Sequence, residues 1–472
     1  MKSPPLDILI MAAGLGTRMR SGRAKVLHQL DGLPLIVHVC RAAAQLQPRM
    51  IYVIVGHQAD EVAAAVGKEF TAQTVRFIKQ AQQRGTGDAV MSARIALSGS
   101  ASTVMVLSGD VPLVRSETLA ALLEQHRAAT NPPTSCTILS VKLDNPTGYG
   151  RIVRDSAGRL LKIVEQKDAN EEERQLREIN AGLYCFDSWA LFQALARVQP
   201  ANEQGEYYLT DVPAILSAQG LAVEVLLHSD AREVSGINTR AELAEFENLR
   251  RRSAIRRLMN DGGVTFIDPS NAYISSEAQV GRDTVIYPGV SIEGKSYVGE
   301  RCEIRSGSRI TNSRLGNGVM VKDHCVVVDS EIADDCAIGP FAHLRMNSRM
   351  ENGAVVGNFV EVKKTRIGRG TKSMHLTYLG DAVIGEKTNI GAGTVTCNYD
   401  GKDKHQTVIE DNVRIGSDTM LVAPVRVGSG SVTGAGSVVT EDVPPNTLVA
   451  GVPAKVKKQL QPEEPKRAGN RQ

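Results

Sequence analysis

A glycine-rich, basic segment near the N-terminus has the residue types that hold phosphate groups. It reads Met11-Ala12-Ala13-Gly14-Leu15-Gly16-Thr17-Arg18-Met19 and is followed by Lys25-Val26-Leu27-His28. Glycines let backbone N–H groups approach an anion, and Arg18 and Lys25 could reach the same anion. The segment has neither the Gly-Lys-Ser/Thr of a P-loop nor the third glycine of the dinucleotide fingerprint. The glycines alone would favour an ordinary strand-to-helix turn, whereas the two cations favour a phosphate-holding loop.

A second group of chemically competent residues lies in the C-terminal half. His375 could act as a base near neutral pH, and three cations, Arg345, Lys363 and Lys404, are candidate phosphate binders. A lone histidine beside an irregular surface turn would instead favour a structural residue with satisfied hydrogen bonds. That interpretation must also account for the cations, so we expect a site.

The elements that position this second group follow a six-residue repeat. Aliphatic residues recur at Val280, Ile286, Ile292, Val298, Ile304 and Ile310, and again at Ile338, Ile384, Ile390, Ile415, Leu421 and Val427. A period of six fits neither an α-helix nor strand alternation, but it suits a coil with three flat faces. Glycine often follows the aliphatic residue, because a corner needs room and permissive backbone angles. The pattern resembles the left-handed parallel β-helix of hexapeptide-repeat acyltransferases.

The repeat is interrupted where the candidate site lies. Ser373 occupies an aliphatic-type position, and segment 397–407 falls in a gap between Thr396 and Val408. Because the gap corresponds to two hexads, we expect an external loop that leaves the phase of the repeat unchanged.

The first half has a different pattern. Short apolar runs at 6–11, 51–55 and 103–107 alternate with helical patterns at 35–46, 60–66, 86–97 and 117–126. This alternation predicts a mostly parallel sheet with helices on both faces, an α/β fold of Rossmann type, with ligands beyond the carboxyl ends of the strands. Asp110 follows one of these runs, which favours a site over a simple turn before Pro112.

Length and composition set the broader class. A chain of 472 residues exceeds what one core usually supports. Lysine plus arginine exceeds aspartate plus glutamate by only 55 − 52 = 3, so charge gives no case for a nucleic-acid partner. Seven scattered cysteines suggest buried thiols in a reducing compartment, and the apolar run at 6–13 is too short to span a membrane. We expect a cytoplasmic protein with no membrane span.

The halves should be joined by a helix. Thr239 and Glu242 form a capping-box pattern, and Gly262-Gly263 would end the helix. Its arginines at 250–252 and 256–257 could bind an anion, although a solvated face is the simpler reading. The predicted boundaries are 1–238 and 263–457 for the two domains, 239–262 for the linker helix and 458–472 for a disordered tail.

The first half resembles the sugar-phosphate nucleotidyltransferases through the phosphate-loop motif. The two halves together resemble a bacterial family that combines N-acetylglucosamine-1-phosphate uridylyltransferase and glucosamine-1-phosphate acetyltransferase activities. The motifs that match this family in order are Gln80, Gly85-Thr86-Gly87, Gly109-Asp110-Val111-Pro112-Leu113, Gly148-Tyr149-Gly150-Arg151-Ile152, Glu165-Gln166-Lys167-Asp168, Ile179-Asn180-Ala181-Gly182, Gly236-Ile237-Asn238, Asn358-Phe359-Val360-Glu361-Val362-Lys363-Lys364 and 389–400.

The resemblance implies a uridylyl transfer site in the first half. A sugar 1-phosphate is already an anionic nucleophile, so its attack on the α-phosphorus of UTP needs cations rather than a general base. Lys25 and Arg18 would supply that charge, and Asp110 with Asn238 would bind Mg²⁺ through oxygen ligands. The residues implied in binding UTP or UDP-N-acetylglucosamine are Ala12, Ala13, Gly14, Lys25, Gln80, Gly85, Thr86, Gly150, Glu165, Asn180 and Asn238. Of these, Gln80, Gly85 and Thr86 hold the uridine, whereas Gly150, Glu165 and Asn180 contact the sugar.

The resemblance also implies an acetyl transfer site and an oligomer. His375 would be the general base, and the acetyl acceptor would be bound by Arg345, Lys363, Tyr378 and Asn389. The residues implied along acetyl-coenzyme A are Ala392, Asn398, Tyr399, Lys404, Ser417 and Ala435, with Asn398 and Tyr399 also near the sugar. Three chains of the family pack through their β-helices into a homotrimer. The product, UDP-N-acetylglucosamine, feeds peptidoglycan and lipopolysaccharide synthesis.

Two departures from the family pattern are visible. Ser108 replaces a tyrosine that often precedes Gly109-Asp110 in relatives, so a contact near the sugar could differ. Segment 450–455 lacks an arginine that some relatives carry, and Lys455 could serve the coenzyme phosphates instead.

Two other classes of protein remain as alternatives. A nucleotidyltransferase with a purely regulatory hexad domain would have no acetyl site, which His375, Lys363 and the 397–407 loop oppose. A noncatalytic assembly subunit would have a degraded phosphate loop, yet Arg18 and Lys25 are both present.

Overall fold

The computed structural model describes residues 4–14, 16–98, 101–128 and 132–461, and it divides the chain into two compact units. Unit 1 is Met1–Phe246 and unit 2 is Glu247–Gln472. The division falls inside helix α8 (Arg240–Asn260), which corresponds to the predicted linker helix. Each unit has its own hydrophobic core.

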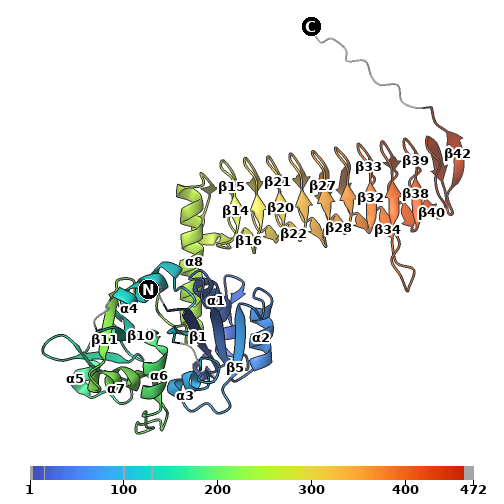
Figure 1. The fold of residues 1–472 in the computed structure, drawn as a ribbon. Coiled ribbons are helices and arrows are strands. Elements are labelled where there is room, and N and C mark those ends of the chain that lie inside the picture. Colours follow the sequence, from blue (N-terminus) through green and yellow to red (C-terminus); the bar gives the residue numbers. More distant parts are fainter. Residues whose placement is uncertain (1–3, 15, 99–100, 129–131, 462–472) are drawn as a thin grey trace. The chain divides into compact units, whose positions relative to one another are not determined.

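Unit 1 contains a nine-stranded sheet whose main order is β11-β7-β10-β6-β1-β4-β5, with β8 beside β10 and β9 beside β8 (Figure 1). Its strands are β1 (Leu6–Ala12), β4 (Met50–Val55), β5 (Val75–Lys79), β6 (Thr103–Ser108), β7 (Thr134–Lys142), β8 (Arg151–Arg154), β9 (Leu160–Val164), β10 (Glu178–Asp187) and β11 (Ala222–His228), and a separate hairpin is formed by β2 (Gln29–Leu30) and β3 (Leu33–Pro34). Its helices are α1 (Leu35–Ala44), α2 (Ala59–Gly67), α3 (Thr86–Met91), α4 (Ser116–Ala128), α5 (Glu171–Arg174), α6 (Ser188–Leu195) and α7 (Val212–Ala218).

The predicted mostly parallel sheet is confirmed. Strand β1 pairs in parallel with β4 and β6, whereas β10 runs antiparallel to both β6 and β7. Successive side chains of β1 enter different cores: Ile8 and Ile10 join one cluster with residues of α1 and α4, and Leu9 joins the other with residues of α3, α6 and α7. Helices therefore cover both faces, as alternating β and α segments predict.

One predicted helix is shorter than expected. The pattern at 86–97 predicts twelve residues, but α3 ends at Met91. Directly beyond it several backbone bonds span three residues, as from Ala93 N to Val90 O and from Arg94 N to Met91 O, both at 3.0 Å, and the Ser92 hydroxyl donates to Ala89 O at 2.6 Å. A hydroxyl that bonds the preceding turn competes with helix continuation.

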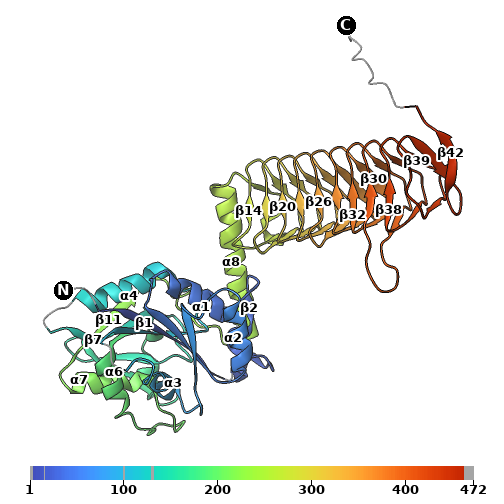
Figure 2. The ribbon, with the colours of Figure 1, turned by 45° about the vertical axis from the view of Figure 1, so that its right-hand side comes forward.

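Unit 2 is the left-handed parallel β-helix that the repeat predicts, with three sheets of 12, 10 and 9 strands (Figure 2). The first sheet contains β12 (Thr265–Phe266), β15 (Val285–Ile286), β18 (Glu303–Ile304), β21 (Met320–Val321), β24 (Ala337–Ile338), β27 (Val355–Asn358), β30 (Lys372–His375), β33 (Asn389–Ile390), β36 (Arg414–Ile415), β39 (Val432–Thr433), β41 (Thr447–Ala450) and β42 (Lys455–Gln459). The second contains β13 (Tyr273–Ile274), β16 (Ser291–Glu293), β19 (Arg309–Thr311), β22 (Val326–Val328), β25 (His343–Arg345), β28 (Glu361–Lys363), β31 (Tyr378–Gly380), β34 (Val395–Cys397), β37 (Met420–Val422) and β40 (Val438–Val439). The third contains β14 (Gln279–Val280), β17 (Tyr297–Val298), β20 (Arg314–Leu315), β23 (Glu331–Ile332), β26 (Arg349–Met350), β29 (Arg366–Ile367), β32 (Ala382–Ile384), β35 (Thr407–Ile409) and β38 (Val425–Val427).

The hexad residues form the core of this coil. Ile286, Ile292, Val298 and Ile304 are fully buried and belong to one continuous cluster that runs through the described coils. The glycines that follow them are needed for space: a Cβ at Gly281 would lie 2.7 Å from the carbonyl carbon of Gly299 in the next coil. The expectation of permissive angles holds at Gly339, which follows Ile338 and has φ +90°, but not at Gly281 or Gly299; elsewhere positive φ angles fall on other corner residues, such as Asp283 at 59°.

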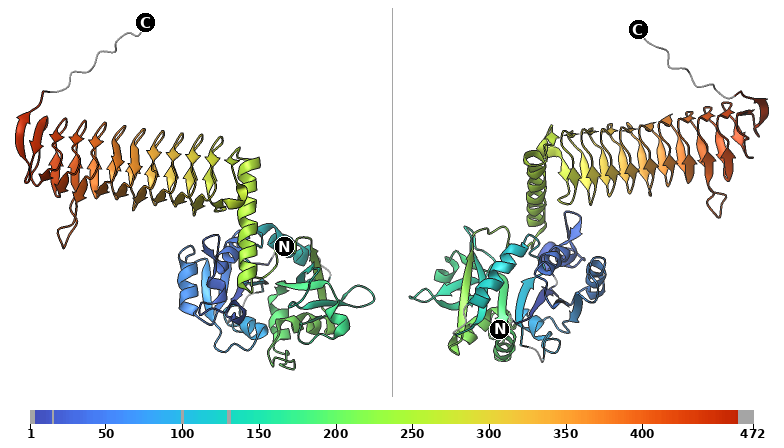
Figure 3. Two further views of the ribbon diagram at one scale, coloured as in Figure 1. Left: turned by 180° about the vertical axis from the view of Figure 1, so that it is seen from behind. Right: turned by 45° about the horizontal axis from the view of Figure 1, so that its top comes forward.

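The external loop is present, but the expected phase was wrong by one residue. Val408 is only partly buried, whereas Ile409 is buried and stacks on Ile384 of the preceding coil. The loop projects from the β-helix between β34 and β35 (Figure 3). Its length need not be a multiple of six, because residues 398–406 belong to none of the paired strands of the coil.

The ends of unit 2 differ from the expected boundaries. The capping box of α8 is confirmed, since Glu242 N donates to Thr239 Oγ1 at 3.2 Å and Thr239 N to Glu242 Oε2 at 2.9 Å. At the other end β42 pairs antiparallel with β41 and extends to Gln459, so the predicted tail boundary at 458 falls inside a strand. Residues 462–472 of that tail lie outside the described residues.

The basic cluster of α8 makes specific contacts within unit 2. Arg250 donates to Ser276 Oγ at 2.9 Å, Arg257 donates to Ser276 O at 3.1 Å, and the Arg251 guanidinium lies over the Tyr273 ring at 4.8 Å. These three arginines hold the helix against the first coil of unit 2. Their contacts match neither of the two interpretations from the sequence, an anion site or a solvated face.

Among the described residues all seven cysteines are free, and six of them are buried. No helix in the described parts of the chain has the length and apolar character needed to cross a membrane.

Candidate active sites

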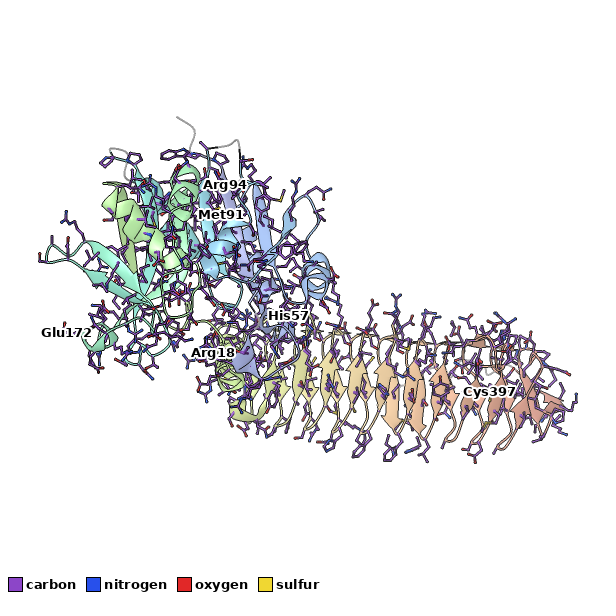
Figure 4. All side chains as sticks on the ribbon, turned by 90° about the horizontal axis from the view of Figure 1, so that it is seen from below. Arg18, His57, Met91, Arg94, Glu172 and Cys397 are labelled. Atoms are coloured by element: carbon purple, nitrogen blue, oxygen red, sulfur yellow. The ribbon has the colours of Figure 1, made fainter. Side chains whose placement is uncertain are left out.

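The phosphate-loop cations meet the predicted metal ligands at the carboxyl ends of β1 and β6. Lys25 Nζ forms an ion pair with Asp110 and donates to Asn238 Oδ1 at 3.1 Å, and Arg18 donates to the same oxygen at 2.8 Å. The structure therefore joins four residues that lie up to 220 positions apart in the sequence. Figure 4 labels Arg18, which lies in the short turn η1 (Thr17–Met19).

The loop glycine Gly16 brings Lys25 into this group. Gly16 has φ +63°, and a Cβ there would lie 2.6 Å from the Cβ of Lys25. Only glycine combines this left-handed backbone with so close an approach. Lys25 begins the turn η2 (Lys25–Leu27), and Gln58 braces the preceding residue by accepting from Ala24 N at 2.6 Å. Sequence reasoning missed Gln58.

Two loops carry the predicted metal ligands, and a buried carboxylate ties them together. Ile237 N donates to Asp110 O at 2.9 Å, which sets Asn238 beside Asp110. Glu233 is 4% exposed and accepts from Arg115 N at 2.9 Å and from Arg115 Nε at 2.8 Å. Burial alone would raise the pKa of Glu233, but its hydrogen bonds with Arg115 outweigh this and lower it. Sequence reasoning missed both residues of this pair.

The donor set at Asp110 and Asn238 fits a magnesium ion. A carboxylate oxygen and an amide oxygen converge on one point, which the Lys25 ammonium contacts in the structure. Mg²⁺ prefers oxygen ligands and completes its octahedron with waters and substrate phosphates, so two protein ligands suffice. The described residues contain no group of three or more His, Cys, Asp or Glu side chains able to enclose a metal.

The residues expected to hold uridine form a second group beside β1. Gln80 is buried and donates to Gly85 O at 3.3 Å and to Asp88 Oδ2 at 2.8 Å. Gly85 has φ +111°, and a Cβ there would lie 2.5 Å from Tyr207 O. Thr86 Oγ1 accepts from Leu209 N at 3.0 Å. These bonds fix the loop before α3.

This uridine loop is connected to the phosphate loop. Gln83, which sequence reasoning missed, donates to Ala13 O at 2.5 Å. Ala12 ends β1, and both Ala12 and Ala13 are buried. Gly14 follows with space around it, since a Cβ there would meet no atom within 4 Å.

The three residues expected to contact the sugar form a third group. Asn180 N donates to Gly150 O at 2.9 Å, and a Cβ at Gly150 would lie 3.5 Å from Glu165 Oε1. Burial raises the pKa of Glu165, although Thr210 donates to its Oε1 at 3.1 Å. Ser108 also belongs here, because its Oγ would lie 3.2 Å from a Cβ at Gly182.

In unit 2 the predicted cations surround one buried carboxylate. Lys363 is 5% exposed, and its Nζ lies 3.4 Å from Asp381 Oδ2. Burial acts to raise the pKa of Asp381, but Asn398 and Lys363 outweigh it and lower that pKa. Lys404 interacts with Lys363, which raises the pKa of Lys363 and lowers the pKa of Lys404. Crowded ammonium groups of this kind favour an anionic ligand.

Arg345 lies one coil before Lys363 and is held by a carboxylate. The register pairs Arg345 with Lys363, and Arg345 donates to Glu361 Oε1 from Nε at 2.9 Å and from its terminal nitrogen at 2.6 Å. Arg345 also acts on the pKa of Lys404, so the three predicted cations lie together. Tyr378 is in register with Glu361 and acts on the pKa of Lys363, which places it beside this cluster.

His375 is exposed and held by one hydrogen bond. Its Nδ1 lies 2.6 Å from Asn358 Oδ1, and the two residues are in register on neighbouring coils. An amide oxygen only accepts, so Nδ1 carries the hydrogen and Nε2 keeps a lone pair. The imidazole is therefore set up to take a proton at Nε2. Asn358 belonged to a matched motif, but its role was not predicted.

The residues expected along coenzyme A share one corner of the β-helix. Asn389 and Arg414 are in register, as are Arg414 and Val432, so Ala392, Ser417 and Ala435 stand three residues later in successive coils. Hydrogen bonds from Asp418 N to Ala392 O at 2.7 Å and from Gly436 N to Ser417 O at 2.8 Å link the coils. The side chains at this corner are small, and Ser417 and Ala435 are exposed.

The external loop carries the remaining predicted residues. Asn398 is buried and hydrogen-bonded to Asp381, which joins the loop base to the cation cluster. Tyr399 is 59% exposed, and its hydroxyl donates to Gly401 O at 2.7 Å. Figure 4 labels Cys397, which ends β34 just before the loop. Two further candidates lie outside the loop. Asn389 is exposed on β33. Lys455 lies in β42, and its Nζ is 3.8 Å from Glu441 Oε1.

The fold and the two sites define a class of protein: a nucleotidyltransferase fused to a hexapeptide-repeat transferase. Family models agree with this class. The model described as nucleotidyl transferase matches residues 8–231, the GMPPB C-terminal domain matches 267–362, and the bacterial transferase hexapeptide (six repeats) matches 406–441.

Curated relatives cover nearly the whole chain. The bifunctional protein GlmU of Syntrophomonas wolfei is 46% identical over 443 residues, which are 94% of this chain and 96% of that protein. The bifunctional protein GlmU of Heliobacterium modesticaldum is 48% identical over 440 residues, which are 93% of this chain and 94% of that protein. The chain belongs to the bifunctional GlmU family.

Proposed function

We propose that the two sites perform consecutive reactions with the residues assigned below. As a GlmU family member, the chain is a bifunctional enzyme of UDP-N-acetylglucosamine synthesis, with glucosamine-1-phosphate N-acetyltransferase and N-acetylglucosamine-1-phosphate uridylyltransferase activities. This product feeds cell-wall precursors. We assign uridylyl transfer to residues 1–238 and acetyl transfer to residues 263–457. The observation that carries the residue assignment is the convergence of Lys25, Arg18, Asp110 and Asn238.

Uridylyl transfer needs positioned charge more than acid–base chemistry. The phosphate oxygen of N-acetylglucosamine 1-phosphate attacks the α-phosphorus of UTP, and pyrophosphate leaves. Lys25 and Arg18 stabilise the charge that develops on the phosphate oxygens, and the backbone at Ala13 and Gly14 approaches the same groups. Gln80, Gly85 and Thr86 hold the uridine, while Gly150, Glu165 and Asn180 orient the sugar.

Nucleotidyl transfer of this class needs a divalent metal ion, and we assign Mg²⁺ to Asp110 and Asn238. When bound, the ion neutralises charge on the triphosphate. Lys25, which contacts both Asp110 and Asn238 in the structure, would add its charge beside the ion to bind the phosphates.

Acetyl transfer needs a free amine. His375 Nε2 takes the proton from the ammonium of glucosamine 1-phosphate, and the amine attacks the thioester carbonyl of acetyl-coenzyme A. The carbon–sulfur bond breaks, and coenzyme A leaves as the thiol after accepting a proton. Arg345 and Lys363 bind the phosphate, with Tyr378 and Asn389 beside the sugar. Acetyl-coenzyme A lies along Ala392, Ser417 and Ala435, with Asn398, Tyr399 and Lys404 near its reactive end.

A reciprocal experiment tests these assignments. Lys25→Ala and Asp110→Ala should each abolish uridylyl transfer and leave acetyl transfer intact, because the acetyl residues belong to the other unit. His375→Ala should abolish acetylation of glucosamine 1-phosphate and leave uridylyl transfer intact. Both activities are measured on each purified variant. Wild-type-like transfer at the altered site would refute the corresponding assignment.

We further propose a cytoplasmic homotrimer formed through the β-helix. An aromatic ladder, defined as the stacked rings of His324, Phe341 and Phe359 together with Leu376 on the next coil, supports this because its exposed side chains follow one corner. The ring centroids of His324 and Phe341 lie 5.2 Å apart, and those of Phe341 and Phe359 lie 5.4 Å apart. Phe341, Phe359 and Leu376 are 50%, 56% and 63% exposed. Exposed apolar strips of this kind mark association surfaces. The free, buried thiols suit a reducing compartment.

A further inference from the structure

We infer that Tyr184 is a positioning residue that fixes the side-chain amide of Asn180 and thereby sets the affinity for the sugar phosphate. This inference rests on the proposed role of Asn180 in binding the sugar. Tyr184 does not line the site itself, since it is 2% exposed and lies in the core beneath the sheet.

The local strand geometry brings the two side chains together. Asn180 and Tyr184 are four residues apart on β10, and in a regular strand this separation spans about 13 Å. The Asn180 Nδ2 nevertheless donates to the Tyr184 hydroxyl at 2.6 Å. The pairing of β10 with β7 shifts register between these two residues, and Gly182 at the shift has φ +72°. The irregularity in β10 therefore creates the contact.

Both ends of the Asn180 amide are held. Its Nδ2 donates to Tyr184, and its Oδ1 accepts from Gly182 N at 3.1 Å. An amide flipped by 180° would place its oxygen at the phenol and its NH₂ group against the Gly182 N–H, where no hydrogen bond can form. The remaining Nδ2 hydrogen and the remaining Oδ1 lone pair are thus presented in one orientation to a ligand.

Tyr184 is itself rigid. Its ring stacks on Phe186 with centroids 5.5 Å apart, and both side chains are buried. Burial raises the pKa of Tyr184, so the hydroxyl stays protonated and uncharged in neutral solution. A buried phenol needs a hydrogen-bond partner, and Asn180 supplies it.

The variant Tyr184→Phe removes only the hydroxyl and keeps the ring in the core. Because a neutral hydrogen bond that orients a binding group is worth a few-fold in affinity, we expect the KM for N-acetylglucosamine 1-phosphate to rise about three- to tenfold. The KM for UTP should stay within about twofold, because the uridine loop makes no use of this hydroxyl. Asn180→Ala should also raise the sugar-phosphate KM, and the double variant should bind no more weakly than Asn180→Ala alone.

The matched control is Tyr52→Phe. Tyr52 is 7% exposed and lies in the same hydrophobic cluster, and its hydroxyl donates to Ala96 O at 3.5 Å. We expect neither KM to change in this control. An unchanged sugar-phosphate KM in Tyr184→Phe, together with a raised KM in Asn180→Ala, would overturn the positioning role alone. A similar rise in both substrates' KM would also overturn it, since that indicates general loosening. An unchanged KM in Asn180→Ala would remove the proposed sugar contact and this inference with it.

Discussion

At the scale of single residues, each site combines predicted side chains with partners that orient them. His375 was predicted as a base, but Asn358 determines which of its nitrogens is free. Lys363 was predicted as a phosphate binder, but its pKa is raised by Lys404 and Asp381, and Asp381 Oδ2 lies 3.4 Å from its Nζ. The partners are as informative as the predicted residues, because a buried cation or an imidazole acts only in a defined state.

Asp381 should be essential for acetyl transfer without touching a substrate. Asp381→Asn leaves buried Lys363 without its counter-charge, and we expect acetyl transfer to fall at least about tenfold, because removing one partner of a buried pair costs several kcal/mol. Steady-state acetylation assays check this. Lys364→Ala is the matched control, since the exposed Lys364 lies 3.7 Å from the other Asp381 oxygen and should matter little. Equal effects of the two substitutions would refute the role of Asp381.

Sequence motifs indicated the candidate site residues better than the partners that orient them. Arg18, Lys25, Asp110 and Asn238 meet as predicted. Tyr184 and Asp381 gave no comparable signal. Tyr184 becomes a partner of Asn180 only through a register shift in β10, which alternation in the sequence does not reveal.

At the scale of elements, the loops after β6 and β11 act as one unit because Glu233 joins them. Arg115 follows Asp110 in the first loop, Glu233 precedes Asn238 in the second, and 118 positions separate Arg115 from Glu233. His228 at the end of β11 lies 3.2 Å from the same carboxylate. We therefore expect Glu233 to hold the two predicted metal ligands in register.

Glu233→Gln should weaken metal binding and make the stability of the fold less dependent on pH. The Mg²⁺ concentration for half-maximal uridylyl transfer should rise, while acetyl transfer stays unchanged. The lowered pKa of Glu233 means that its carboxylate stabilises the fold above its ordinary value of 4.5, and this stability is lost as pH falls through the folded pKa. The variant should therefore show a smaller loss of unfolding free energy between neutral and acid pH.

Urea unfolding at several pH values, followed by circular dichroism, measures this second effect. At neutral pH we expect Glu233→Gln to lose about 1–3 kcal/mol of unfolding free energy, the cost of weakening charge-assisted hydrogen bonds to a buried group. Asp230→Asn is the control in the same loop, since Asp230 pairs with the exposed Arg232. A magnesium response equal to wild type would contradict the proposed coupling of the loops.

The elements of unit 2 were the most predictable part of the fold. A hexad repeat has one structural solution that buries every aliphatic residue, and Val280 to Val427 follow it. The error came at the loop, where Ile409 rather than Val408 resumes the core. A segment that leaves the coil is not constrained by the coil's period, so its length cannot be inferred from the repeat.

At the scale of the whole molecule, two units with separate cores each carry one group of candidate site residues. The predicted boundary at 238 differs from the observed division after Phe246 for a physical reason. Phe246, in the first turns of α8, packs with Leu30, Leu35 and Ile237 of unit 1. The first part of the predicted linker helix thus belongs to the hydrophobic core of unit 1. The sequence did not indicate this, because the helix is mostly polar.

The homotrimer proposal predicts a specific mass. Sedimentation equilibrium at micromolar concentration should give three times the 50.8 kDa of one chain. Phe359→Glu places a charge in the aromatic ladder and should shift the protein towards monomers. The rate of acetyl transfer should fall as the trimer dissociates, because Leu376 of the ladder is next to His375 in the chain. Uridylyl transfer should persist. A monomeric wild-type protein would contradict the proposal.

The central claim is that one chain acetylates glucosamine 1-phosphate and then uridylylates the product, using His375 for the first step and Lys25 for the second. The most direct measurement is the formation of UDP-N-acetylglucosamine from glucosamine 1-phosphate, acetyl-coenzyme A and UTP with Mg²⁺. Wild-type protein should form it, His375→Ala and Lys25→Ala should each fail alone, and a mixture of the two variants should restore it. Formation of the product by either single variant at the wild-type rate, or failure of the mixture, would contradict the account.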